Sequence, residues 1–187
     1  MDSKRFTDAL KQIPLQFLLL IVAGLIAIFV AMIPDLVVKA VIWFGNGSSA
    51  NHVAGIEYVV IGIVGLVAST LAMYQFMKKP GVDGAIYAIR ASGEHAKFNP
   101  LYPALIILFS FVIYLGMCYI VDFNFICGSV QYFARFFDKA IDTQSLSEVS
   151  ITSKLISFAI LAVCEIPAMV LGYIKGFKER LSGNSLL

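Results

Sequence analysis

Four apolar runs, each long enough to cross a membrane as a helix, constrain this chain more than any motif does. The runs cover residues 15–33, 57–77, 101–121 and 155–174. A helix needs about 20 mainly apolar residues to cross the hydrocarbon core of a bilayer. Backbone groups in that core must find their hydrogen bonds within the segment, so each run is expected to be helical. We therefore predict an all-α membrane protein with four transmembrane helices in a single domain, residues 1–187.

The composition supports a bilayer as the solvent and argues against several soluble functions. Hydrophobic residues make up 59% of the chain and charged residues only 14%, whereas soluble domains carry about 25% charged residues. The net charge of +2 is too small to favour direct binding to nucleic acid. We find no nucleophile–base pair, no cluster of metal-ligating residues and no phosphate-binding glycine loop. We therefore expect neither an enzyme nor a cofactor.

The distribution of Lys and Arg predicts the orientation in the membrane. Ten of the 14 Lys and Arg lie in the N-terminal tail, the segment 78–100 and the C-terminal tail. The outer segments 34–56 and 122–154 hold the other four. Because cytoplasmic loops carry an excess of positive residues, both termini and segment 78–100 are expected in the cytoplasm. The size and compactness favour a multi-pass protein of the bacterial inner membrane.

The two outer segments differ in pattern. Pro34-Asp35 is expected to end the first helix, and the apolar stretch that follows is too short to span and is expected to lie at the interface. The second outer segment alternates apolar and charged positions at helical spacing. It predicts an amphipathic helix that caps the bundle, rests on the membrane, or docks something outside. Its apolar face carries Phe133, Phe136 and Phe137, and its charged face carries Arg135 and Lys139.

Segment 78–100 has 23 residues, which is long for a turn between packed helices. Pro80-Gly81 is expected to break the second helix, and "VDGAIYAIRAS" is expected to form a short helix. The segment has two interpretations, as a basic anchor at the lipid headgroups or as a docking site for a soluble cytoplasmic protein. The candidate docking residues are Lys78, Lys79, Tyr87, Arg90 and Lys97, with Lys175, Lys178 and Arg180 of the C-terminal tail.

Glu165 is the most unusual residue, because it is the eleventh of the twenty residues of the fourth run. An acid at the bilayer centre costs about 2.5–3.5 kcal/mol, so we expect its neutral form. Tyr114, Ser110 and Ser69 are its expected hydrogen-bond partners. Pro167 lacks a backbone donor and is expected to kink the helix beside the acid. The site is interpreted as a hydrogen bond across a helix interface, an ion-conducting group or a switch.

Stripes of small residues at four-residue spacing predict close helix packing in lipid. Such stripes serve either as an internal seam or as an interface between copies, and we expect a homo-oligomer. Two of them are Ala23-Ala27-Ala31 and Ala168-Gly172-Gly176.

Together these features favour a non-catalytic membrane subunit that forms a homo-oligomer and docks a soluble cytoplasmic partner. One alternative is a small oligomeric channel with Glu165 near its axis. A polar stripe along one helix is expected for a pore, whereas the polar residues here are isolated. Another alternative is an exclusion or immunity protein that blocks a partner in the same membrane.

The arrangement of the four runs resembles one known family. With the chain's size and predicted topology, the stretches "LQFLLLIVAGL", "GIEYVVIGIVGL", "LYPALIILFSF" and "LISFAILAVCEIP" look like the membrane subunit of the Kiwa anti-phage defence system. The resemblance implies an oligomeric inner-membrane sensor that acts with a cytoplasmic DNA-binding effector. It rests on topology and size, and assigns no role to a single residue.

Overall fold

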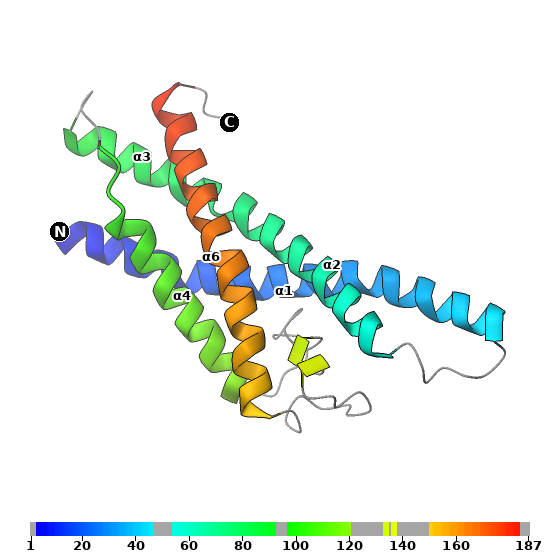
Figure 1. Cartoon of the computed structure of the whole chain (residues 1–187). Coiled ribbons are helices and arrows are strands. Elements are labelled where there is room, and N and C mark those ends of the chain that lie inside the picture. The colour runs from blue at the N-terminus through cyan, green and yellow to red at the C-terminus, as the bar shows by residue number, and fades with distance from the viewer. Residues whose placement is uncertain are drawn as a thin grey trace. The chain divides into compact units, whose positions relative to one another are not determined.

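The computed structural model is helical throughout the long elements that it describes (Figure 1). The described residues are 3–46, 54–92, 97–120, 133–134, 136–137 and 150–183. The long helices are α1 (Ser3–Asn46), α2 (Ala54–Phe76), α3 (Lys78–Ser92), α4 (Leu101–Ile120) and α6 (Ile151–Leu181). No strand occurs in these parts of the chain. The predicted all-helical fold is confirmed for them.

The helices are long and apolar enough to support the membrane assignment. Three candidate spans, Leu10–Pro34, Tyr58–Arg90 and Ile151–Leu181, meet the length and hydropathy required, and Leu101–Met117 is a shorter apolar helix. Large apolar side chains are also widely exposed, for example 69% of Phe29 and 72% of Val163. Exposure on this scale fits a surface that meets lipid. Four spans and cytoplasmic termini remain predictions.

The first helix is longer than predicted, because Pro34 does not end it. α1 continues through Pro34 to Asn46, so the stretch expected at the interface is a continuation of the same helix. A proline removes one backbone donor, and helices in membranes tolerate that loss. Beyond Pro34 the apolar pattern resumes at once, and Leu36 and Val37 are both more than half exposed.

The break after the second helix also differs from the prediction. α2 ends at Phe76 and α3 begins at Lys78, so only Met77 separates them. Hydrogen bonds cross this junction: Met77 N donates to the Met73 carbonyl over 3.0 Å, and Gly81 N donates to the Met77 carbonyl over 3.2 Å. Pro80 and Gly81 lie inside the first turn of α3, where a missing backbone donor is tolerated. The short helix expected from Val82 is therefore part of a longer one.

Side-chain caps set the starts of the last two helices. Asn99 Oδ1 accepts a hydrogen bond from Leu101 N over 3.0 Å at the start of α4. At α6, Ser150 Oγ accepts from Ser153 N over 3.3 Å, and the Ser150 carbonyl accepts from Lys154 N over 3.1 Å. This is an N-cap, and it starts α6 four residues before the predicted span. Gly183, with a φ of +78°, follows its end, as glycine often does after a helix.

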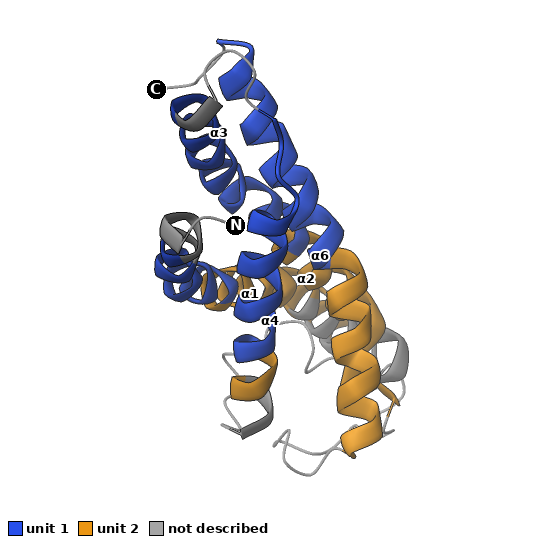
Figure 2. Ribbon diagram, turned by 90° about the vertical axis from the view of Figure 1, so that its left-hand side faces the viewer, with its two compact units in different colours: residues 1–20, 70–114, 165–187 blue, residues 21–69, 115–164 orange. Residues whose placement is uncertain are grey.

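The chain divides into two compact units, which Figure 2 distinguishes by colour. Unit 1 holds residues 1–20, 70–114 and 165–187, and unit 2 holds residues 21–69 and 115–164. The core of unit 1 includes the fully buried Met73, Met77, Ile106, Met169 and Tyr173. In unit 2 the small residues Ala23, Ala27 and Ala31 are buried, as are Ile61 and Phe133. The alanine stripe of α1 therefore faces the chain's own interior.

Candidate functional site

Two glycines of α6 bring this helix against the backbone at the α2–α3 junction. A Cβ atom on Gly172 would collide with the carbonyl oxygen of Tyr74, and one on Gly176 would collide with that of Lys78. Only a residue without a side chain allows helices to approach so closely. The predicted stripe of small residues on α6 thus serves as an internal seam. This seam fixes the start of α3 on α6.

The opposite faces of α3 differ in character. Ala85 and Ala88 are buried, at 0% and 8% exposure, and Gly81 approaches the backbone of Tyr173. Lys79 and Arg90 are exposed and lie eleven residues apart, which is about three helical turns. The two cations therefore share one face of α3, and the small residues that pack on α6 lie on the other.

An aromatic cluster connects the segment before α4 to α6. The ring of Phe98 packs edge-on against Tyr173, with centroids 6.0 Å apart, and against Phe177, with centroids 5.3 Å apart. Tyr173 and Phe177 stack with an interplanar angle of 22°, and Tyr102 lies 6.3 Å from Tyr173. This packing holds residues 97–102 on the last turns of α6.

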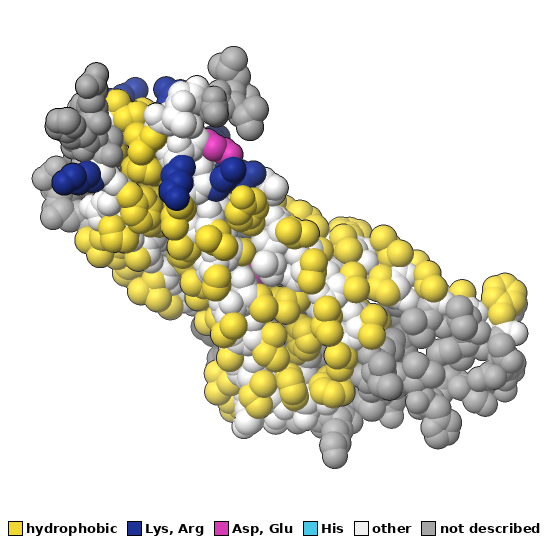
Figure 3. Space-filling view, turned by 45° about the horizontal axis from the view of Figure 1, so that its top comes forward, with side chains coloured by type: hydrophobic (Ala, Val, Ile, Leu, Met, Phe, Trp, Pro, Cys, Tyr) yellow, Lys and Arg dark blue, Asp and Glu magenta, His cyan; other side chains and the backbone are white. Residues whose placement is uncertain are grey.

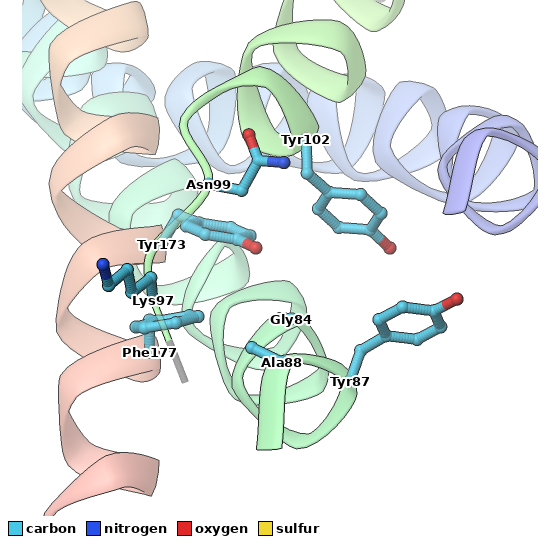
Figure 4. A pocket seen from close by; sticks show the side chains of 8 residues that line it. All are labelled: Gly84, Tyr87, Ala88, Lys97, Asn99, Tyr102, Tyr173 and Phe177. Carbon is cyan, nitrogen blue, oxygen red and sulfur yellow. The ribbon is translucent and has the colours of Figure 1, made fainter. Parts of the chain in front are cut away.

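Figure 4 shows the small cavity beside this cluster. It is lined by Tyr87, Lys97, Asn99, Tyr102 and Tyr173 among others, and Gly84 leaves room for the Tyr173 hydroxyl. Its volume is about 30 Å³, far below the roughly 300–1,000 Å³ of small-molecule sites. The cavity is too small for a substrate or a nucleotide, and the aromatic groups act here as packing.

The predicted docking residues all belong to unit 1. Lys79, Arg90, Lys97 and Lys178 are exposed. Figure 3 shows Lys and Arg side chains gathered near α3 and the end of α6, beside a largely hydrophobic surface.

Several of the basic side chains already have contacts. Lys78 Nζ lies 5.0 Å from the Tyr74 ring centroid, an attractive cation–π geometry. Lys175 pairs with Glu179 over 3.5 Å, and Arg180 also has an interaction partner. The cations that remain most open to an external partner are therefore Lys79 and Arg90 of α3, together with Lys97 and Lys178.

Glu165 lies inside the protomer, with 3% of its surface exposed. Tyr114 is 2% exposed, and both residues have an interaction partner. The two expected serine partners give their protons to backbone carbonyls: Ser110 Oγ donates to Ile13 O over 3.4 Å, and Ser69 Oγ donates to Leu66 O over 3.1 Å.

Pro167 lies on the exposed side of an unbroken α6. It is two residues from Glu165, about 200° around the helix, so the two side chains point in different directions. The proline therefore faces away from the buried acid.

A further polar residue, on α1, is buried and was not among the predicted site residues. Gln16 is fully buried, and neither its Oε1 nor its Nε2 atom has a hydrogen-bond partner among the described residues. Gln12 Oε1, one helical turn earlier, is also without one in that part of the chain. Ser110 meets the intervening turn through the carbonyl of Ile13. Gln16 was visible as the one polar residue in the run "LQFLLL".

The predicted outer-face helix is described only in part. Phe133 is 7% exposed and lies against Gly62 of α2, where an added Cβ would be 3.1 Å from its ring. Phe136 and Phe137 are about 40% exposed, with ring centroids 5.5 Å apart. Arg135 and Lys139 lie outside the described residues, so the charged face stays a prediction.

Comparison with protein-family models, curated proteins and solved structures gives no match for this chain. Within the described residues, no group of three or more His, Cys, Asp or Glu is placed to hold a metal ion. The evidence for a function therefore comes from the chain's own geometry, above all from the fixed, basic face of α3.

Proposed function

We propose that this chain is a non-catalytic membrane subunit that docks a soluble protein on the exposed face of α3. The observation that carries the proposal is the contrast between the two faces of this helix. Gly81 on one face is in close contact with the backbone of α6, while Lys79, Asp83 and Arg90 are exposed. A partner therefore meets charged groups on a helix whose position is already determined, which reduces the entropy lost on binding.

The exposed face of α3 also carries apolar area between its cations. Ile89 is 38% exposed, and Ile86 and Tyr87 are partly exposed. Protein interfaces combine apolar and aromatic contacts with a charged rim. This mixture fits a protein partner whose surface is complementary and acidic.

Self-association remains part of the proposal, but through other surfaces than the small-residue stripes. Gly172 and Gly176 already contact the chain's own backbone, and Ala27 and Ala31 are fully buried. A homo-oligomer would therefore form through exposed apolar faces such as the one that carries Phe29. Burial of Glu165 within the protomer does not favour a pore in which this carboxyl lines a shared axis.

The resemblance to the Kiwa membrane subunit suggests a biological role for the docking function. In this role the chain resides in the bacterial inner membrane, with both termini and α3 in the cytoplasm. It reports on events at the outer face to a cytoplasmic DNA-binding effector. The chain itself makes no direct contact with nucleic acid.

The test is a pull-down of the tagged protein in mild detergent, with mass spectrometry and sizing of the complex. The variant Lys79→Gln/Arg90→Gln removes both cations from the exposed face, and Lys11→Gln, an exposed cation of α1, is the matched control. We expect a stoichiometric soluble partner with the wild type and with Lys11→Gln, and loss of that partner with the double variant.

Two results would contradict the docking function. The first is full retention of the partner by the double variant. The second is a partner-free oligomer whose ion flux in liposomes changes with Glu165→Gln, which would assign the chain to the channels.

A further inference from the structure

A groove of about 360 Å³ lies along the last turns of α6, which places it within the size range of small-molecule sites. Ile174, Phe177 and Leu181 line it at three- and four-residue spacing, so they form one stripe along the helix. Phe98 forms another part of its lining, and its ring is held edge-on to Phe177. The groove is thus apolar and partly built from packed aromatic rings.

One cation, Lys178, belongs to the lining of the groove. Three more, Lys97, Lys175 and Arg180, are close to its lining residues in sequence. Over residues 97–102 and 174–183 the only acid is Glu179, and that carboxylate pairs with Lys175. A ligand in the groove therefore meets apolar side chains together with the ammonium group of Lys178.

The groove begins where the apolar run of α6 ends. Ile174 is the last residue of the predicted span, and the basic residues start at Lys175. A molecule whose apolar part remains in the hydrocarbon while its charged part reaches the interface would fit this position. Basic pockets at the ends of membrane helices bind anionic headgroups in this way.

The geometry points to a binding site for one anionic phospholipid, with an acyl chain along Phe98, Ile174 and Phe177 and the phosphate at Lys178. This inference rests on membrane insertion and not on the docking function of α3, which is proposed for Lys79 and Arg90. A protein segment in the same groove would have to leave water to reach Ile174. A lipid already lies at that depth, and this difference favours the lipid.

The experiment is a lipid titration of the purified protein in nonionic detergent, followed by native mass spectrometry. Dioleoyl phosphatidylglycerol is compared with dioleoyl phosphatidylcholine, which has the same acyl chains and no net charge. Lys178→Gln tests the headgroup contact, and Ile174→Gln tests the apolar lining; Lys178 is exposed and Ile174 is partly exposed, so both variants should fold. Lys11→Gln is the control for a cation outside the groove.

We expect tighter binding of phosphatidylglycerol than of phosphatidylcholine. Lys178→Gln should weaken the binding of phosphatidylglycerol about fivefold, the usual effect of one Lys at an anionic surface. Ile174→Gln should weaken both lipids, and Lys11→Gln neither. Equal binding of the two lipids, or an equal loss with Lys11→Gln, would overturn the proposal. It would also be overturned if Lys178→Gln released a soluble protein while leaving lipid binding unchanged.

Discussion

Replacement of Gly176 by alanine should destabilise the protein, although alanine is the better helix former. A Cβ atom at this position would meet the carbonyl oxygen of Lys78 and lie 2.8 Å from its carbonyl carbon. Both atoms belong to the backbone at the start of α3, so they cannot turn aside as the end of a flexible side chain would. α6 and α3 would have to separate.

The magnitude follows from two opposing effects. Overpacking of a close contact costs about 1–3 kcal/mol, and a backbone obstacle places Gly176→Ala near the upper value. Alanine in place of glycine inside a helix recovers about 1 kcal/mol. The free energy of unfolding should therefore fall by about 2 kcal/mol.

Gly116 provides the matched control, because it also lies inside a helix, α4, and a Cβ added there meets none of the described residues within 4 Å. Gly116→Ala should show only the gain in helix propensity, about 1 kcal/mol. Unfolding by increasing SDS in mixed micelles, followed by far-UV circular dichroism, would measure both free energies. If Gly176→Ala stabilised the protein as Gly116→Ala does, the proposed seam between α6 and the α2–α3 junction would be wrong.

Three further changes test other parts of the structure by the same unfolding assay. Gln16→Leu removes an amide with no partner among the described residues, so stability should rise by about 1–3 kcal/mol; a loss would indicate a bound water or ion at the amide. Ser150→Ala removes the N-cap of α6 and should lower stability by about 1 kcal/mol, whereas Ser150→Asp, which can still cap, should not. Glu165→Gln keeps a neutral hydrogen-bonding group, and its effect should stay near the average for such bonds between membrane helices, about 0.6 kcal/mol. A much larger loss would indicate that the carboxyl is charged in the native protein.

The apolar runs predicted the helices well, because a long apolar segment in lipid has few alternatives to a helix. The ends were harder to predict. Pro34 and Pro80 were both expected to interrupt a helix, yet α1 and α3 include them. A proline at the first turn loses nothing, and one inside a long helix loses a single hydrogen bond. Ser150 gave a readable capping signal, but the prediction followed hydropathy and began the span at Leu155.

The residues of the candidate site were predictable from the sequence, but the contacts between them were not. The spacing of Gly172 and Gly176 indicated a close helix contact, but a stripe of small residues does not identify its partner, which is the α2–α3 backbone. The basic residues were found from charge alone. The groove at Lys178 required Phe98, which lies 80 residues away in sequence and reaches α6 only in the folded chain.

The single residue between α2 and α3 has a mechanical consequence. The carbonyls of Tyr74 and Lys78, on either side of Met77, are each covered by a glycine of α6. The helix junction at Met77 is therefore held against α6 on both sides. α3 therefore cannot swing freely on Met77. Any tilt of α6 would move the exposed cations of α3 with it, and in the proposed docking function this movement would be passed to the bound soluble protein.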